Sequence, residues 1–321
     1  MEYGFGFGGR KMRQLRIVCL VSVLAGVAGL ACGKSASAQT PVTNAGGCTT
    51  ADFHAAHLEG KDMKFNVILP VDYASDAERR FPVLYLLHGF TGNYTDWCAN
   101  SRLVDYAKPY DEIIIMPEGD NSWYVNSYSD PEQRWEEYIV EDLIGYVDSH
   151  YRTVASREGR AIAGLSMGGY GALFLGLKHH DTFAAVASLS GVVAEANLGR
   201  WDVPIHERFK NGQSQFFQDI RKTQAADFGP ENNPGRNDED PFLLIRALTP
   251  ANCPQLYLAV GWGDNLLNEN RKFVALLSQL KMPYRYAEVP GEHEWKVWDE
   301  QIQRVLALEA PVIGAQRRAS N

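Results

Sequence analysis

Residues 164 to 168 read Gly164-Leu165-Ser166-Met167-Gly168, and this stretch decides the fold. A short apolar run, 160–163, precedes it, and a small-residue segment, 169–174, follows it. Strand, turn and helix in this order predict a nucleophile elbow, which lifts a serine clear of the backbone. One glycine lies two residues before the serine and one lies two residues after it, because larger side chains would collide in so sharp a turn. We interpret Ser166 as a nucleophile; the alternative is an ordinary turn serine.

Two more candidate residues follow near the C-terminus. A strand-like run, 255–260, leads into Gly261-Trp262-Gly263-Asp264, and a later one, 284–289, leads into a loop that contains His293. The chain order Ser166, Asp264, His293 is the order of α/β-hydrolases. Ligands of open α/β sheets bind outside the carboxyl ends of the strands, so we expect the three side chains to meet there.

The residue types fit nucleophilic catalysis. A serine hydroxyl needs a base to take its proton, and a neutral imidazole does this near pH 7. Asp264 would orient His293 and stabilise the imidazolium that forms. A helix N-cap is the alternative role for Asp264, since aspartate in a glycine-rich loop often caps a helix.

The reaction also needs an oxyanion hole. The backbone N–H of Met167, directly after the nucleophile, is one expected donor. The second should come from the loop that follows the early strand 83–87, which reads His88-Gly89-Phe90-Thr91-Gly92. We assign it to Phe90, with Gly89 as the alternative.

The remaining pattern predicts a mostly parallel, doubly wound sheet. Strand-like runs alternate with amphipathic helical segments, of which 135–149 is the clearest, and this alternation places helices on both faces of one sheet. The expected strands are 64–69, 83–87, 112–116, 160–163, 183–190, 255–260 and 284–289. The other expected helices are 99–108, 169–179, 266–280 and 295–308.

Residues 195–250 interrupt this alternation. The segment combines amphipathic pieces with a polar stretch, 229–235, rich in Gly, Pro and Asn. Loops this long usually have a function, so we expect a cap-like insertion over the active site. A surface excursion that touches no substrate is the alternative. A cap would turn its aromatic side chains toward an acyl or sugar pocket, namely Trp201, Phe209, Phe216 and Phe217.

Aromatic residues elsewhere are candidates for substrate contact. Trp123 and Tyr124 lie in a polar loop, 120–126, and we predict that both bind substrate. Large aromatics usually pack in cores, and this remains the default for four others, Trp97, Tyr128, Trp262 and Trp295.

The amino end has the composition of an export signal. Basic residues precede an apolar run, 17–31, and Ala36-Ser37-Ala38 supplies a small-x-small cleavage site, so residues 1–38 are predicted to be a signal peptide. The run is too short for a comfortable membrane span, which needs about 20 residues. Lipidation at Cys32 is the alternative, and Met12 is an alternative start.

These features divide the chain into a signal peptide (1–38), a linker (39–59), an α/β-hydrolase domain (60–310) and a tail (311–321). The expected location is secreted or periplasmic.

The net charge and the cysteines limit which partners and which compartment fit this protein. The sequence has 31 Lys+Arg and 39 Asp+Glu, of which the first 38 residues hold five and one, so the mature chain carries a formal −12. Such a surface should repel nucleic acid and anionic membranes. Cys48, Cys98 and Cys253 remain after cleavage; one disulfide fits an oxidising compartment, and Cys48 with Cys98 is the favoured pair. No Cys/His spacing indicates zinc, and no metal or other cofactor is expected.

Four motifs together resemble the esterase D-like group of α/β-hydrolases. They are His88-Gly89-Phe90-Thr91-Gly92-Asn93, Met116-Pro117-Glu118-Gly119, Gly164 to Ala172 and Gly291-Glu292-His293-Glu294-Trp295. The group includes feruloyl and acetyl-xylan esterases, tributyrin esterases, S-formylglutathione hydrolases and mycolyltransferases. The resemblance covers about residues 60 to 305 and implies a fold and a catalytic class. Residues 195–250 carry no motif of any one subfamily.

We therefore expect a secreted serine carboxylesterase that hydrolyses feruloyl or acetyl esters of sugars or plant polysaccharides. Export argues against S-formylglutathione, whose thiol belongs to a reducing cytoplasm. Two alternatives remain: acyl transfer to a sugar acceptor, and a carbohydrate-binding protein that keeps the fold without the chemistry. The oligomeric state is not predicted.

Overall fold

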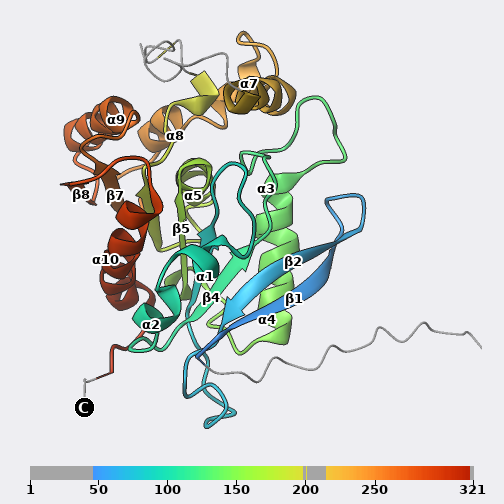
Figure 1. Ribbon diagram of the computed structural model, residues 1–321, viewed down its shortest axis with the longest axis vertical. Helices are drawn as coiled ribbons and strands as arrows, with labels where there is room; N and C mark the ends of the chain where they lie inside the picture. Colours follow the sequence, from blue (N-terminus) through green and yellow to red (C-terminus); the bar gives the residue numbers. More distant parts are fainter. Residues whose placement is uncertain (1–45, 198–199, 201–214, 319–321) are drawn as a thin grey trace, which may run out of the picture. The chain divides into compact units, whose positions relative to one another are not determined.

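Two parallel strands form the centre of the sheet. In the computed structural model, β3 (Val83–Leu87) pairs with β5 (Arg160–Leu165), in register from Val83 against Arg160 to Leu87 against Gly164. Every residue of both strands is buried. Continuous apolar runs of this kind occur where helices cover both faces of a parallel sheet. The structure describes residues 46–197, 200 and 215–318 (Figure 1).

The sheet of the described residues has eight strands in the order β1-β2-β4-β3-β5-β6-β7-β8. Neighbours from β4 to β8 pair in parallel, whereas β1 and β2 form an antiparallel edge. The other strands are β1 (Cys48–Ala55), β2 (Lys61–Ile68), β4 (Ile113–Pro117), β6 (Ala185–Leu189), β7 (Gln255–Gly261) and β8 (Tyr284–Val289). The expected α/β-hydrolase architecture with a mostly parallel sheet is confirmed.

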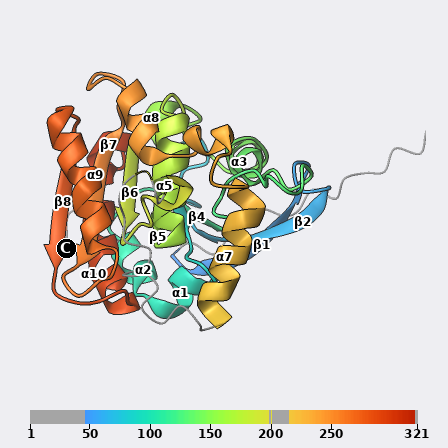
Figure 2. The same ribbon diagram turned by 90° about the horizontal axis from the view of Figure 1, so that it is seen from above.

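Helices cover both faces of this sheet (Figures 1 and 2). One apolar cluster packs under α1 (Asp96–Asn100), α2 (Leu103–Ala107) and α10 (Trp295–Ile313). The other packs under α3 (Trp135–Glu137), α4 (Ile144–His150), α5 (Met167–Lys178), α8 (Pro241–Ala247) and α9 (Leu267–Gln279). The predicted helix 135–149 is helical throughout, but its middle, Tyr138–Leu143, is a π-helix.

Two predicted boundaries are wrong. The segment 39–59, predicted as a linker, contains β1, whose eight residues pair with β2. Its alternating exposed and buried residues make it an edge strand, a pattern weaker than that of the central strands. The segment 311–321, predicted as a tail, begins inside α10, and Arg318 then pairs with Asp111. The predicted signal peptide, 1–38, lies outside the described residues.

The favoured disulfide is present. Cys48 at the start of β1 is bonded to Cys98 in α1, and Cys253 is buried and free. The bond fastens α1 to the sheet directly after the loop 88–95, so it braces the segment that leads out of β3.

Candidate active site

The turn between β5 and α5 leaves Ser166 half-buried at its tip. Ser166 has a φ of 53° and a ψ of −117°, a conformation that L-residues rarely adopt. Its N–H donates to the carbonyl of Leu189 in β6 at 2.9 Å, which fixes the turn against the next strand. A Cβ at Gly164 would meet the backbone of Gly168, and a Cβ at Gly168 would meet the carbonyls of Leu87 and His88. The two flanking glycines are therefore sterically required.

The loops after β7 and β8 bring the other two residues to this serine. His293 Nε2 lies 2.9 Å from Ser166 Oγ, and His293 Nδ1 lies 3.0 Å from Asp264 Oδ2. Both distances are within hydrogen-bond reach for a nucleophile, a base and its orienting acid. Three residues separated by up to 127 positions thus form one hydrogen-bonded chain.

The environment of Asp264 keeps it ionised. Burial opposes ionisation, but hydrogen bonds from His293 and from the Leu266 N–H outweigh it and hold the pKa of Asp264 below its ordinary value. The Leu266 N–H donates to Oδ1 at 2.9 Å, which leaves Oδ2 for the imidazole. Because the carboxylate accepts at His293 Nδ1, the Nε2 of a neutral imidazole is free to accept the serine proton.

The loop after β3 lies directly over the serine. A Cβ at Gly89 would come within 3.4 Å of Ser166 Cβ, and Phe90 borders the same space as Ser166 and His293. Among the described residues no group accepts a hydrogen bond from the Phe90 N–H. Met167 starts α5 on the other side of the serine. Phe90 and Met167 therefore come from the two segments next to Ser166, and their role as oxyanion donors stays a prediction.

His88 holds this loop in place. The Gly119 N–H donates to His88 Nε2 at 2.9 Å, so Nε2 carries no proton and Nδ1 donates to the Gly89 carbonyl at 2.8 Å. His88 therefore links the loop after β3 to the loop after β4 through both ring nitrogens.

The structure places the two predicted substrate-binding aromatics in different surroundings. Trp123 lines a cavity with Ser166, and its Nε1 donates to Thr223 Oγ1 at 3.2 Å. The prediction for Tyr124 is wrong, because its side chain is fully buried and its hydroxyl donates to the His88 carbonyl at 3.1 Å. Both residues have positive φ, so this turn sends neighbouring side chains in different directions. A polar loop in the sequence gives no sign of that reversal.

An apolar cavity of about 220 Å³ opens on one side of Ser166. Helix α7 (Gln215–Phe228) closes it with Phe216, Phe217 and Ile220, opposite Trp123 and Phe90. The insertion therefore contributes to the site at α7, as expected of a cap. Trp201 and Phe209 lie outside the described residues. Sequence reasoning missed four further lining residues, which no motif marks: Val192, Glu195, Asn265 and Leu266.

A second cavity, of about 390 Å³, also borders Ser166 and is more polar. Asp96 and Glu294 contribute carboxylates, and Trp295 and Trp298 form an aromatic wall. We call this space the polar cavity and the first one the apolar cavity. Phe90, Phe216, Ser166 and His293 border both.

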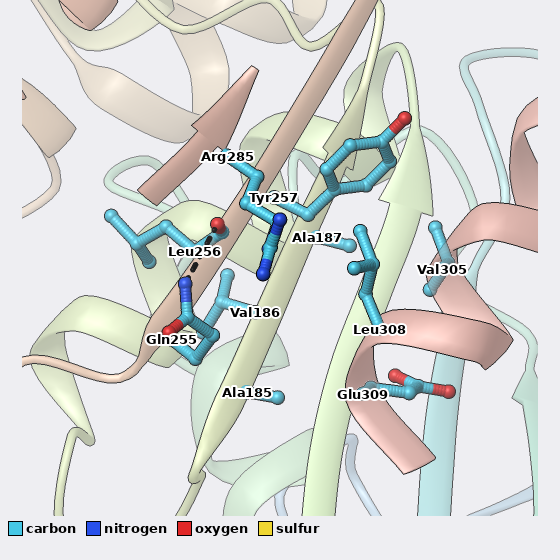
Figure 3. A pocket seen from close by; sticks show the side chains of 10 residues that line it. All are labelled: Ala185, Val186, Ala187, Gln255, Leu256, Tyr257, Arg285, Val305, Leu308 and Glu309. Atoms are coloured by element: carbon cyan, nitrogen blue, oxygen red, sulfur yellow. Dashed lines mark hydrogen bonds between the residues drawn. The ribbon is translucent and has the colours of Figure 1, made fainter. Parts of the chain in front are cut away.

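A third, unrelated cavity lies at the opposite end of the strands. Figure 3 shows it between the starts of β6 and β7 and the side chains of α10, with Gln255 and Glu309 at its edge. Its volume of about 20 Å³ accommodates about one water molecule, so it is too small for an ester substrate. It also lacks Ser166 and His293. Among the described residues, no group of three or more His, Cys, Asp or Glu side chains is placed to hold a metal ion.

A family described as "Putative esterase" matches residues 56–308. The chain belongs to this esterase family. The match spans the described strands from β2 to β8 and the three residues of the hydrogen-bonded chain. The resemblance expected from the four motifs is therefore confirmed.

Individual relatives include hydrolases and an acyltransferase. This esterase is 30% identical over 259 residues to an acetyl esterase of Caldicellulosiruptor saccharolyticus, covering 78% of this chain and 93% of the relative. It is 25% identical to a diacylglycerol acyltransferase/mycolyltransferase of Mycobacterium leprae, covering 69% and 72%. The solved fluorophosphonate-binding serine hydrolase F of Staphylococcus aureus superposes with a TM-score of 0.69 at 25% identity, covering 84% and 99%. The protein is a carboxylic ester hydrolase of the α/β-hydrolase fold.

Proposed function

We propose that this protein is an exported serine esterase that hydrolyses acyl esters of sugars or plant polysaccharides. Ser166 is the nucleophile, His293 the base and Asp264 its orienting acid. The observation that carries the proposal is the unbroken hydrogen-bonded chain from Asp264 through His293 to Ser166.

The reaction follows from this geometry. His293 Nε2 takes the Ser166 proton as Oγ bonds to the ester carbonyl carbon, and the negative carbonyl oxygen accepts hydrogen bonds from the N–H groups of Phe90 and Met167. The imidazolium then donates its proton to the alcohol oxygen as that bond breaks, leaving an acyl-serine. Water, deprotonated by His293, attacks the acyl carbon, and the proton returns to Ser166 as the acid leaves.

The two cavities separate the two halves of the substrate. The leaving alcohol must lie near His293, and the residues that follow His293, Glu294 and Trp295, line the polar cavity. The alcohol therefore belongs there. The acyl group occupies the apolar cavity, where Trp123 and Phe216 offer flat walls for an aromatic or short alkyl group.

The lining of the polar cavity favours a neutral polyol over an anion. Asp96 and Glu294 accept hydrogen bonds from hydroxyl groups but repel carboxylates, so a glutathione leaving group fits poorly. The Cys48–Cys98 disulfide supports an oxidising compartment and, with the pattern of residues 1–38, export. N-terminal sequencing of the mature protein tests export; a chain that retains residues 1–38 would contradict it.

One substrate panel tests the reaction. Purified protein is assayed with p-nitrophenyl acetate, butyrate and octanoate beside methyl ferulate and acetylated xylan, and it is labelled with a fluorophosphonate probe. We expect labelling at Ser166 and release of acetate or ferulate from the sugar-linked esters. Folded protein that takes no label would favour the alternative of a non-catalytic carbohydrate-binding protein.

Acyl transfer is the second candidate, favoured by the mycolyltransferase relative. The same acyl-serine reacts with whichever hydroxyl reaches it, and a polar cavity that binds a polyol also places an acceptor. Product partition decides between them: an acylated sugar forming faster than free acid at millimolar sugar supports transfer, whereas free acid alone supports hydrolysis.

A further inference from the structure

A further space, whose lining does not include Ser166, shares Trp295 with the polar cavity. That space has a volume of about 350 Å³ and is lined by the end of α1 and the first turn of α10, at Asn100, Ser101, Arg102, Trp295, Lys296 and Asp299. Trp295 borders both spaces. We call the space of about 350 Å³ the outer groove.

Trp295 is held rigidly between two other indoles. Its ring meets Trp97 edge-to-face at 5.4 Å and Trp298 at 5.3 Å. Trp97 is anchored in turn, because its Nε1 donates to the Leu87 carbonyl at 3.1 Å. The partly exposed face of Trp295 is thus a fixed wall, and no side chain needs to be ordered when a ligand packs against it.

The opposite wall of the outer groove is also fixed. Residues 99–102 follow Cys98, which the disulfide ties to β1. The Arg102 N–H donates to Asp299 Oδ1 at 2.7 Å and the Tyr106 hydroxyl donates to Oδ2 at 3.1 Å, which joins α2 to α10 beneath the groove. The groove is a preformed feature of two joined helices.

The chemistry of the lining indicates the ligand. The Arg102 guanidinium lies 3.5 Å from Asp299, so their charges largely cancel, while Asn100 offers a neutral donor and acceptor and Lys296 offers ammonium donors. Hydroxyl groups of a neutral sugar match such donors and acceptors, and the apolar face of a sugar ring covers an indole. A hydrocarbon chain would leave these polar groups without partners, and an anionic chain would meet Asp96 and Glu294 at the entrance to the catalytic serine.

We propose that the outer groove is a second carbohydrate subsite, which binds the sugar unit adjoining the acylated one. This inference rests on the proposed function, because it places the polysaccharide chain of that substrate. The acylated sugar lies in the polar cavity against Trp298, and its neighbour packs on Trp295 between Asn100 and Lys296. Each of the two spaces is within the range of about 300–1,000 Å³ typical of ligand pockets.

The experiment compares ligands of different length on selected variants. The side chains of Asn100 and Lys296 are exposed and make no hydrogen bond to the described residues, so Lys296→Ala removes one contact and Asn100→Trp fills the groove. Gln303→Ala, exposed on the same helix two turns away, is the matched control. Substrates are methyl ferulate and a series of feruloylated arabinoxylan oligosaccharides; unesterified xylobiose and xylotetraose serve as inhibitors.

In the wild type we expect kcat/KM to rise with the second sugar unit, and xylotetraose to inhibit methyl ferulate hydrolysis more strongly than xylobiose. Lys296→Ala and Asn100→Trp should lose at least about threefold in kcat/KM on the oligosaccharide esters through KM, with methyl ferulate unchanged. Variants with wild-type ratios across the series would overturn the second subsite while leaving the sugar esterase intact. Wild-type turnover of p-nitrophenyl acetate with none of any sugar ester would overturn both proposals.

Discussion

The indole of Trp298 packs edge-to-face on the imidazole of His293, with ring centroids 5.0 Å apart. Trp298 also contacts Trp295, so the base of the hydrogen-bonded chain and the wall of the polar cavity are held by one buried side chain. Trp298 lies in α10 and His293 lies two residues before it. Helix α10 packs on β5, β6 and β7. The position of the base relative to Ser166 therefore depends on how this helix docks.

The nucleophile is tested first by Ser166→Ala. Turnover of p-nitrophenyl acetate should fall by several decades because the three residues act as a unit. The fold should persist, since the backbone bonds of the turn remain; thermal unfolding checks this. Residual kcat above about a tenth of the wild-type value would remove Ser166 from the mechanism.

Loss of the base and loss of its orienting acid should lower the activity to different extents. His293→Ala should be about as damaging as loss of the serine, whereas Asp264→Asn should be milder because a poorly oriented imidazole still accepts a proton. Steady-state kinetics on both purified variants measure this. Full activity of Asp264→Asn would assign the orientation of His293 to another group.

The pH dependence should report one ionisation. The hydrogen bonds to Asp264 outweigh its burial and keep its pKa low, so it stays deprotonated above pH 5 and does not shape the profile. An imidazole acts as a base only when it is neutral, so kcat/KM should rise as the pH is raised and the base loses its proton. A flat profile would argue against an imidazole base.

Phe216 should set the preference for the acyl group. It is 45% exposed on α7, and its ring contacts Phe90 at 5.8 Å at the border between the two cavities. Phe216→Ala should raise KM for octanoyl and feruloyl esters several-fold and change p-nitrophenyl acetate turnover by less than about twofold, because only a remote binding contact is lost. Lys222→Ala, exposed on the same helix, is the control. Unchanged ratios would move acyl selection to Trp123.

Much of the catalytic arrangement could be predicted because its signals are local. A glycine pair around Ser166 and loops after two strands define positions that sheet topology then brings together. Tyr124 and β1 could not be predicted in this way. The direction of Tyr124 depends on two consecutive residues with positive φ, and the pairing of β1 depends on a partner strand and a disulfide. The two cavities around Ser166 form between segments far apart in sequence, so no stretch of the chain predicts their separate characters.

The disulfide should contribute substantially to stability. It closes a loop with a sequence separation of 50, for which the chain-entropy relation gives about 4 kcal/mol. Cys48→Ser with Cys98→Ser should therefore lower Tm by roughly 8–15 °C, measured by calorimetry. Cys253→Ser is a control, since that thiol is buried but unpaired and its conservative replacement leaves the loop closed. Equal Tm values for the double variant and the wild type would show that α1 is held by its packing alone.

A buried carboxyl pair should make the protein less stable as the pH rises. Glu112, directly before β4, and Glu309 in α10 are 2% and 4% exposed, and among the described residues neither Glu112 oxygen has a hydrogen-bond partner. Burial raises the pKa of Glu112 to about 8, and burial together with Glu112 raises that of Glu309. Between the ordinary value of 4.5 and about 8, the folded state binds more protons than the unfolded state, so the free energy of unfolding falls as pH rises.

Glu112→Gln removes this titration while keeping the shape of the side chain. At pH 5 it should match the wild type within about 0.5 kcal/mol, and at pH 9 it should be more stable by at least about 1 kcal/mol, because a unit of pKa shift corresponds to about 1.4 kcal/mol. Urea unfolding at both pH values measures the difference, with Glu300→Gln, exposed on α10, as the control. A variant whose difference from the wild type is the same at pH 5 and pH 9 would show that Glu112 is ionised in the folded protein throughout. The docking of α10 beside His293 would then be independent of this pair.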